Sequence, residues 1–214
     1  MGKLYAFDMI TLDGYFEGPG GDISWHRVDD EFNTFAQEQL QGIGVLLFGR
    51  RTYDLMASYW PTPAALSDDA EIAGRMNRLP KAVASRTLTQ AAVTWENTRL
   101  MGSDLAAEVA ELKAEAAGDV AVFGSGELLN ALIPLGLVDE YRLMVAPLAI
   151  GAGTPLQLVL FPGVALPLHI FEPRYRALVR HLLAEADALI VVPEDATEVP
   201  AGASVEVIPL EQHR

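Results

Sequence analysis

The chain has 214 residues, half of them hydrophobic, and its 29 acidic and 15 basic residues give a net charge of −14. This length suits one α/β domain, or one domain with a small appendage. The negative charge disfavours nucleic acid and anionic membrane surfaces as partners, and the longest apolar runs fall far short of the ~20 residues of a membrane-spanning helix.

Cysteine is absent from the sequence, so disulfides, thiolate metal ligands and thiol catalysis are excluded. The four histidines are scattered without metal-ligand spacing, and we expect no metal. The N-terminus has no signal-peptide pattern. We therefore expect a soluble, cytoplasmic protein.

The chain is predicted to begin with a strand at residues 3–10, followed by a turn at Asp13-Gly14, a pair of residues that favours turns. Asp13 can either stabilise this turn or contact a ligand. Residues 17–22 (EGPGGD) contain too much glycine and proline for regular structure, and their composition is that of a mobile lid.

A helix is predicted at residues 25–41, because apolar side chains recur there on one face. Its first turn carries Asp29, Asp30 and Glu31. Acidic residues complement the helix dipole at this position, which is the commoner reason for them. The alternative is that one carboxylate, with Trp25 beside it, contacts the polar part of a substrate.

Residues that suit an anion follow three predicted strands. They are Gly49, Arg50, Arg51 and Thr52 after the strand at 45–48, Ser85 and Arg86 at the end of the strand at 81–85, and Gly124, Ser125 and Gly126 after the strand at 120–123. Basic residues at a helix N-terminus oppose the helix dipole, so two arginines there suggest a negative ligand. Glycines before a helix let backbone N–H groups approach a phosphate, although they also occur simply because the chain turns sharply.

The remaining elements alternate between strand and helix without a linker. Helices are predicted at 67–78, 104–117 and 127–133, and strands at 93–95 and 141–150. The segment 120–150 reads as a strand–helix–strand unit, which implies a parallel pair of strands. This alternation predicts one α/β domain up to about residue 153, with the three strand ends together at the carboxyl side of the sheet, where such sheets bind ligands.

Five segments occur in a specific order: TLDGYF, FGRRTY, KAVASRTL, VFGSGELLNAL and LVDEYRLMVAPLAIGAGTPL. Together they resemble the dihydrofolate reductase-like family that includes the reductase domain of bacterial riboflavin biosynthesis (RibD C-terminal type). The resemblance covers residues 3–156. It implies a three-layer α/β/α fold with a mostly parallel twisted central sheet and flanking helices, NADPH as cofactor, and a homodimer.

The resemblance also implies roles for individual residues. Residues 49–52 would hold the cofactor's phosphates, Ser85 and Arg86 would lie near its 2′-phosphate, and residues 124–126 would take the pyrophosphate. On the substrate side, Trp25 and Asp30 match the spacing of a tryptophan and an acidic residue in dihydrofolate reductases. Asp13 matches a substrate-proximal aspartate of the riboflavin-type reductases.

The tail, residues 157–214, departs from this pattern. Residues 158–179 resemble the opening of the N-terminal domain of Lon-type proteases, and the last segment is similar to the small C-terminal β-domain of a molybdopterin-biosynthesis protein. We expect replacement strands at 166–171, 188–192 and 204–208 and a helix at 174–185, packed on the domain formed by residues 1–156.

The leading hypothesis is an NADPH-dependent reductase that transfers hydride to a small heterocyclic, pterin- or pyrimidine-like substrate. One alternative is a non-catalytic nucleotide-binding module, whose altered tail has removed the substrate pocket. A second alternative is a Lon-type peptide-binding surface on the tail.

Overall fold

The computed structural model describes residues 2–146, 148–156, 168–169, 188–191 and 206–209. Its contacts divide the chain into two compact units. The first unit contains Met1–Ala6 and Arg27–Asp139, and the second contains Phe7–His26 and Glu140–Arg214. The first strand, β1 (Leu4–Thr11), contributes residues to both. The boundary predicted at residue 156 stays a prediction.

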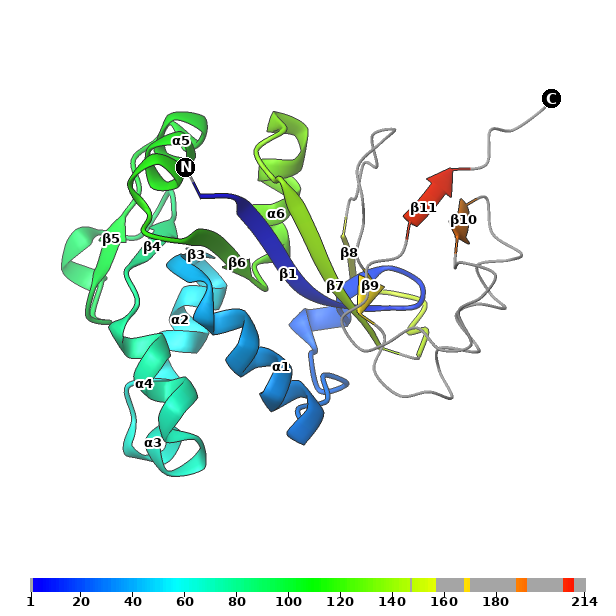
Figure 1. Ribbon diagram of the computed structural model, residues 1–214, viewed down its shortest axis with the longest axis horizontal. Coiled ribbons are helices and arrows are strands. Elements are labelled where there is room, and N and C mark those ends of the chain that lie inside the picture. The colour runs from blue at the N-terminus through cyan, green and yellow to red at the C-terminus, as the bar shows by residue number, and fades with distance from the viewer. Residues whose placement is uncertain (1, 147, 157–167, 170–187, 192–205, 210–214) are drawn as a thin grey trace. The chain divides into compact units, whose positions relative to one another are not determined.

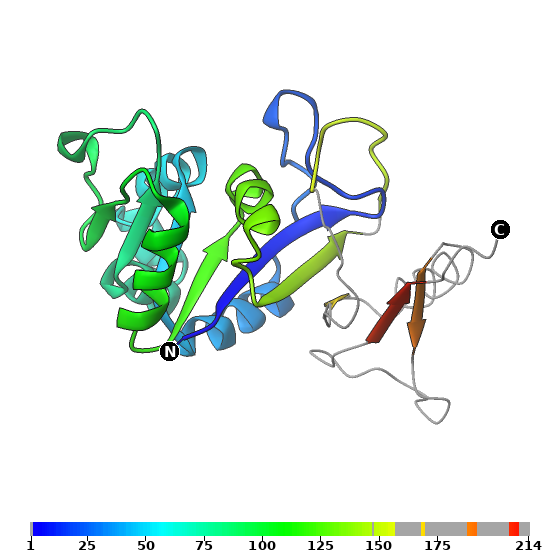
Figure 2. The same cartoon turned by 90° about the horizontal axis from the view of Figure 1, so that it is seen from above.

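The first unit is an α/β structure with parallel strands. Its strands are β3 (Ile43–Gly49), β4 (Lys81–Ala84), β5 (Thr98–Leu100) and β6 (Asp119–Phe123). Its helices are α1 (Asp30–Gln41), α2 (Arg50–Tyr59), α3 (Pro63–Asp68), α4 (Ala70–Arg78), α5 (Leu105–Glu115) and α6 (Gly126–Leu132). The segments η2 (Gln90–Ala92) and η3 (Ile133–Leu135) are 3₁₀ turns. The strand order is β5-β4-β3-β6-β1, and β3 pairs in parallel with both β4 and β6. Figure 2 shows β6 (green) beside β1 (dark blue).

Helices cover both faces of these strands. Helices α5 and α6 lie on one side, and α1, α3 and α4 lie on the other (Figure 1). This three-layer arrangement explains why the central strands are near-continuous apolar runs, since both of their faces are buried. Leu46, Leu47 and Phe48 of β3 are fully buried, as are Ala121 and Val122 of β6. The predicted mostly parallel sheet with flanking helices is confirmed.

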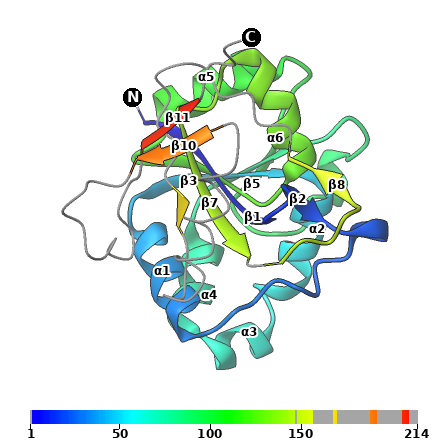
Figure 3. The same cartoon turned by 90° about the vertical axis from the view of Figure 1, so that its right-hand side faces the viewer.

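The described residues of the second unit lie mainly in strands. They are the end of β1, β2 (Tyr15–Glu17), β7 (Glu140–Ala146), β8 (Thr154–Pro155), β9 (Leu168–His169), β10 (Ala188–Val191) and β11 (Glu206–Pro209), and η1 (Pro19–Gly21) is a 3₁₀ turn. Here β7 lies between β1 and β9 and is parallel to β9. Strands β2 and β8 form a separate antiparallel pair, visible in Figure 3.

Three segments of the first 80 residues differ from what the sequence predicted. Helix α1 begins at Asp30 rather than at residue 25, because Asp29 has an extended backbone (φ −133°) and its carboxylate caps the helix. The helix predicted at 67–78 is split into α3 and α4 at Asp69, which is also extended (φ −153°) and caps α4. Residues 19–21 form a 3₁₀ turn that a 2.8 Å hydrogen bond from Gly18 N to Asp22 O closes.

Two predictions about strands are wrong. Residues 93–95 do not form a strand; Trp95 is buried there in a loop, and the strand is β5, a few residues later. Strands β6 and β7 are not paired with each other, because β1 pairs with both. The helix between them is therefore part of a crossover that skips one strand.

In the tail, all three described segments with regular structure fall within or overlap the predicted strands. Strand β9 pairs with β7, whereas β10 and β11 pair with each other in a separate two-stranded sheet. The helix predicted at 174–185 lies outside the described residues. Within the described part of the chain, none of the helices combines the length and apolarity that crossing a bilayer requires.

Candidate functional site

The three segments predicted to bind an anion lie at one edge of the first unit. Because β3 is parallel to β4 and to β6, with Gly49 opposite Ala84 and Leu47 opposite Val122, the carboxyl ends of these strands are neighbours. The residues that follow each strand are therefore brought together. This convergence confirms the geometric part of the prediction.

The turn after β3 leads directly into α2. Gly49 is the N-cap residue, with extended backbone and no side chain to cap the helix, and the first turn contains Arg50 and Arg51 but no acidic residue. A helix N-terminus leaves backbone N–H groups unpaired and carries partial positive charge. The first turn of α2 thus combines two sources of positive potential.

The turn after β6 packs against the turn after β3. Gly124 (φ 58°) and Ser125 (φ 62°) are both left-handed, and the Ser125 hydroxyl accepts a 2.8 Å hydrogen bond from Gly49 N. A Cβ placed on Gly124 would lie 3.6 Å from Thr52 Cγ2. A left-handed serine costs roughly 1–2 kcal/mol, so the surrounding contacts hold a strained conformation.

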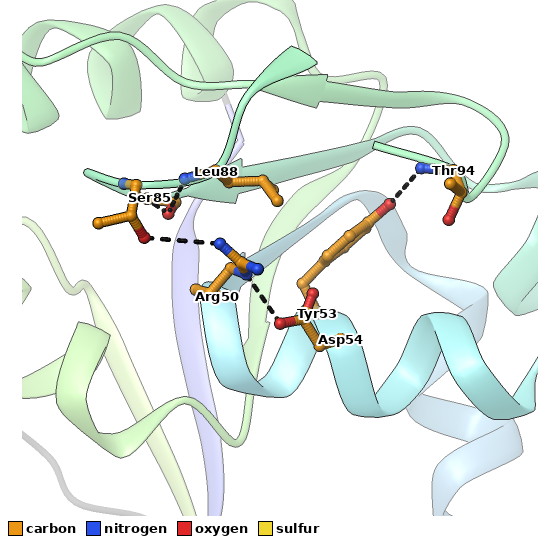
Figure 4. Close-up of polar contacts among 7 residues, drawn as sticks. Arg50, Tyr53, Asp54, Ser85, Leu88 and Thr94 are labelled. Carbon is orange, nitrogen blue, oxygen red and sulfur yellow. Dashed lines mark hydrogen bonds and ion pairs between the residues drawn. The ribbon is translucent and has the colours of Figure 1, made fainter. Parts of the chain in front are cut away.

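Arg50 links α2 to the turn after β4. Its Nε donates to Asp54 Oδ2 at 2.8 Å (Figure 4), and its Nη1 lies 3.5 Å from Thr87 Oγ1. Arg51 extends toward α6, where its Nη1 is 3.8 Å from Glu127 Oε1. Both arginines are at least partly exposed, and each lies beside a carboxylate, Arg50 beside Asp54 and Arg51 beside Glu127.

The turn after β4 is shaped by Ser85. Its hydroxyl accepts hydrogen bonds from Leu88 N at 2.9 Å and Thr87 N at 3.2 Å (Figure 4). Arg86, between these residues, is exposed. The serine therefore organises the loop, and the arginine is presented at its surface.

A buried aromatic group supports this edge. The Tyr53 hydroxyl of α2 accepts from Thr94 N at 3.1 Å (Figure 4) and from Trp95 N at 3.1 Å, and Trp95 stacks on Phe48 of β3 with ring centroids 5.9 Å apart. The ammonium of Lys81 lies 4.5 Å from the Trp95 ring and donates to three backbone carbonyls at 2.7–3.0 Å. Burial lowers the pKa of Lys81 to about 8, against the opposing charge of Glu96. These contacts attach α2 firmly to β3 and β4.

In the second unit, the Asp13 carboxylate links its own turn to the loop at residues 150–151. It accepts hydrogen bonds from Thr11 Oγ1 at 2.6 Å, Gly151 N at 2.7 Å and Ile150 N at 3.1 Å. Desolvation is the largest single influence and raises the pKa of Asp13, but the hydrogen bonds together outweigh it and hold the pKa below its ordinary value. Of the two roles open from the sequence, the structure shows Asp13 in the turn-stabilising one.

The other proposed substrate contacts fall in different units. Asp30 is exposed in the first turn of α1, in the first unit, and the neighbouring Asp29 accepts a 3.0 Å hydrogen bond from Phe32 N as the helix cap. Trp25 lies in the second unit, where its ring contacts His26 edge-on with centroids 4.3 Å apart. The roles of Trp25 and Asp30 toward a substrate stay predictions.

Two polar residues of the second unit were missed by the sequence analysis. Asp8 is only 4% exposed within β1, and His26 is half-buried after β2. The one sequence signal for Asp8 was an acidic residue inside the apolar run LYAFDMIT. No cluster of three or more potential metal ligands occurs among the described residues.

Comparison with known proteins agrees with this fold. A family model described as the RibD C-terminal domain matches residues 3–167, and one described as the MoeA C-terminal region (domain IV) matches residues 181–210. Two proteins of Bacillus subtilis (strain 168) are similar in sequence, and both are named as uncharacterized. YyaP is 33% identical over 148 residues, covering 69% of this chain and 76% of YyaP; YwjB is 23% identical over 155 residues, covering 72% and 82%.

Two crystal structures share the fold. A putative riboflavin biosynthesis protein from Shewanella sp. PV-4 superposes with a TM-score of 0.53 at 21% identity, over 97% of this chain and 98% of its own. A diaminohydroxyphosphoribosylaminopyrimidine deaminase/5-amino-6-(5-phosphoribosylamino)uracil reductase from Thermotoga maritima gives 0.52 at 15% identity, over 97% of this chain and 56% of that longer one. With the family model matching most of its length, the chain belongs to the RibD C-terminal domain family.

Proposed function

We propose that the protein is an NADPH-dependent reductase that transfers hydride to a small heterocyclic, pterin- or pyrimidine-like substrate. The observation that carries the proposal is the convergence of three strand ends, with two arginines at the uncapped start of α2, the glycine turn before α6 and the exposed Arg86. The chain belongs to the RibD C-terminal domain family, and one protein of similar structure is named as a reductase. Both facts support a reductase activity.

The residues present fit a phosphate-rich cofactor. Gly49 and Gly124 let a ligand approach the backbone of the two turns closely. A Cβ on Gly49 would lie 3.4 Å from Leu128 Cβ, and Gly124 has a left-handed backbone, which residues with a Cβ rarely adopt. Within residues 49–52, the backbone N–H groups of residues 50–52 and the guanidinium of Arg50 or Arg51 would bind phosphate, since Gly49 N already donates to Ser125 Oγ. Residues 124–126 would contact the pyrophosphate, and Ser85 with Arg86 would contact the 2′-phosphate.

NADPH would supply the hydride, and the chain would supply position and charge. The Ser125–Gly49 hydrogen bond and the Tyr53 contacts hold the phosphate-binding turns in place before the cofactor arrives. Such preorganisation lowers the cost of ordering the site on binding. For the substrate, Trp25 and Asp30 remain the proposed contacts.

A non-catalytic nucleotide-binding module is the second candidate, and one observation favours it. Asp13, which the family resemblance places near the substrate, has its carboxylate engaged in hydrogen bonds with Thr11 and with the backbone of Ile150 and Gly151. If Trp25 and Asp30 also lack a role, the chain would bind NADPH without turning over a substrate. Binding of NADPH without oxidation of it in the presence of dihydrofolate, pterins and pyrimidines would select this candidate.

Titration of NADPH against NADH, followed by the fluorescence of the reduced nicotinamide, tests the proposal. We expect NADPH to bind at least about tenfold more tightly than NADH, since Arg86 would lose one charge-assisted contact worth roughly 1.5–3 kcal/mol. Arg86→Ala should reduce this preference, and Arg50→Ala should weaken binding of both nucleotides. Arg78→Ala, which removes an exposed arginine from α4, is the matched control.

If neither NADPH nor NADH bound, the proposal would be contradicted and the three turns would be structural features alone. Equal weakening by Arg78→Ala and Arg50→Ala would mean that only the overall charge matters. We also propose a homodimer, as the family resemblance implies. Sedimentation equilibrium should then report twice the mass of the chain, and a mass of one chain at all concentrations would contradict it.

A further inference from the structure

Helices α1 and α4 of the first unit pack against each other (Figure 1), and a small hollow lies between them. Its volume is about 130 Å³, whereas one water molecule takes up roughly 30 Å³ in the liquid. Leu40 and Ile72 line the hollow as buried apolar residues, and Glu71, Arg75 and Arg78 line it as charged ones. The space therefore suits a molecule of a few heavy atoms that combines charged groups with an apolar one.

Glu71 and Arg75 are spaced for an ion pair along α4 but do not form one. They are four positions apart with the acid first, which is the favourable order on a helix. The guanidinium of Arg75 instead donates to Leu40 O at 3.1 Å and to Gln41 O at 3.0 Å, at the end of α1. Among the described residues the Glu71 carboxylate has no cation beside it. A carboxylate without a partner thus borders the same hollow as a guanidinium that is fixed in place and, with five N–H donors, has others to offer.

Gly74 makes room for the second arginine. Glycine is, after proline, the least favourable residue inside a helix, and Gly74 is in the middle of α4. A Cβ at this position would lie 3.1 Å from Arg78 Nη1 and 3.8 Å from Arg78 Cζ. The guanidinium of Arg78 is therefore folded back over Gly74, and no acidic side chain of the described residues pairs with it. The residue at position 74 determines where this charge lies.

The helix dipole explains the order of these charges but not the rest of the arrangement. Acids are favoured in the first turn of a helix and bases in the last, as Glu71 and the two arginines are in α4. The dipole does not require a glycine at the one position where a side chain would displace the Arg78 guanidinium. Nor does it account for opposite charges that border one hollow without pairing across it.

We propose that the hollow between α1 and α4 is a binding site for a small zwitterion, an α-amino acid with a short side chain. Arg75 and Arg78 bind its carboxylate, and Glu71 accepts hydrogen bonds from its ammonium group. The side chain of the ligand contacts Leu40 and Ile72. Such a ligand has no net charge, so the net charge of −14 on the chain does not repel it at long range.

This site is separate from the residues assigned to NADPH. It lies beside the last turn of α1, which ends at Gln41, just before β3 begins at Ile43. The nucleotide turns follow the opposite, carboxyl ends of β3 and β4, which are parallel. The two sites share no residue, so the amino-acid site stands or falls independently of the nucleotide proposal.

Titration of the full chain with L-alanine, without nucleotide, tests the site. In a ¹H–¹⁵N spectrum the Nε–H signals of Arg75 and Arg78 should shift saturably, with a dissociation constant on the order of 1 mM. The signal of Arg50, whose Nε donates to Asp54 at 2.8 Å, should stay unchanged. Propionate lacks the ammonium group and L-alaninamide lacks the carboxylate, and each should bind at least about tenfold more weakly than L-alanine.

Variants separate a ligand site from a structural role of the same residues. Glu71→Gln should weaken L-alanine binding at least about tenfold, whereas Glu38→Gln, which removes an exposed acid of α1 outside the hollow, should leave it within about twofold. Gly74→Ala should displace the Arg78 guanidinium and weaken binding at least about fivefold. It should also raise the midpoint of urea denaturation, since alanine is the better helix former.

Weaker binding by a more stable variant cannot come from damage to the fold, so Gly74→Ala keeps the test decisive if Glu71→Gln is unstable. Absence of any saturable shift with L-alanine would overturn the proposal. So would equal binding of propionate or L-alaninamide, or an affinity that neither Glu71→Gln nor Gly74→Ala changes.

Discussion

Ser125 shows how a single residue connects two turns of the candidate site. Its left-handed backbone is unfavourable for a residue with a Cβ, yet its hydroxyl accepts from Gly49 N at 2.8 Å. A glycine would fit the backbone without strain but would lose the hydrogen bond. At Ser125, an unfavourable backbone conformation is therefore accompanied by a favourable hydrogen bond that links the two turns.

These two opposing effects predict an order of stability among variants at position 125. Ser125→Ala keeps the strain and loses the hydrogen bond, and it should lower the free energy of unfolding by about 1 kcal/mol. Ser125→Gly loses the same bond but relieves the strain, and it should be about 1 kcal/mol more stable than the alanine variant. Urea denaturation measures both. An alanine variant as stable as the glycine variant would show that the left-handed conformation carries no cost here.

Asp8 predicts a pH dependence of stability. Its pKa is about 8 in the folded chain and near its ordinary value of 3.8 when unfolded, so between these values the folded state holds the extra proton. The free energy of unfolding should therefore fall as pH rises from about 4 to 8, by up to roughly 1.4 kcal/mol per pH unit. Asp8→Asn, which cannot ionise, should remove this contribution.

Urea denaturation of the wild type and Asp8→Asn at several pH values between 5 and 8 isolates the effect, because the other carboxyls contribute equally to both. The variant should gain stability relative to the wild type as pH increases. Parallel stability curves across this range would mean that Asp8 ionises normally in the folded chain.

At the scale of elements, the start of α1 depends on Asp29. Its carboxylate accepts a hydrogen bond from Phe32 N at 3.0 Å, whereas the neighbouring Asp30 is exposed. Asp29→Ala should destabilise the fold by about 1 kcal/mol and Asp29→Asn by little, since asparagine also caps helices. Its exposed ion pair with Arg27 adds little.

Asp30→Ala is the control and should change stability by less than about 0.5 kcal/mol. Thermal or urea denaturation of the three variants gives the comparison. If Asp30→Ala were as destabilising as Asp29→Ala, the capping role assigned to Asp29 would be wrong.

The elements that the sequence predicted well are those whose local pattern agrees with their packing. Apolar strands such as β3 and β6 are buried on both faces, and a parallel sheet necessarily brings their carboxyl ends together. The convergence of Gly49, Ser85 and Ser125 could thus be inferred before the structure. The start of α1 was also available in principle, because Asp29 is a favourable capping residue.

Other features depend on tertiary contacts that no local pattern encodes. Trp95 lies in an apolar segment that resembles a strand, but it is held in a loop by the Tyr53 hydroxyl and by a 2.7 Å bond to Asn77. Asp8 looked like an isolated polar residue in a strand. Only its burial and its unpartnered oxygen distinguish it.

For the whole molecule, the net charge of −14 makes the position of each basic group informative. An anionic cofactor is repelled by the protein at long range and needs local positive charge to bind. The start of α2 and the turn after β4 supply that charge through Arg50, Arg51 and Arg86. We therefore propose that the three strand ends of the first unit, and not another surface, hold the nucleotide.

Hydrogen exchange measured by mass spectrometry, with and without saturating NADPH, tests this claim most directly. Bound nucleotide should protect backbone amides in three separate segments, residues 49–52, 85–88 and 124–127, while those of α4 exchange unchanged. Protection confined to other segments, or no protection in the presence of NADPH, would contradict the assignment of this edge as the cofactor site.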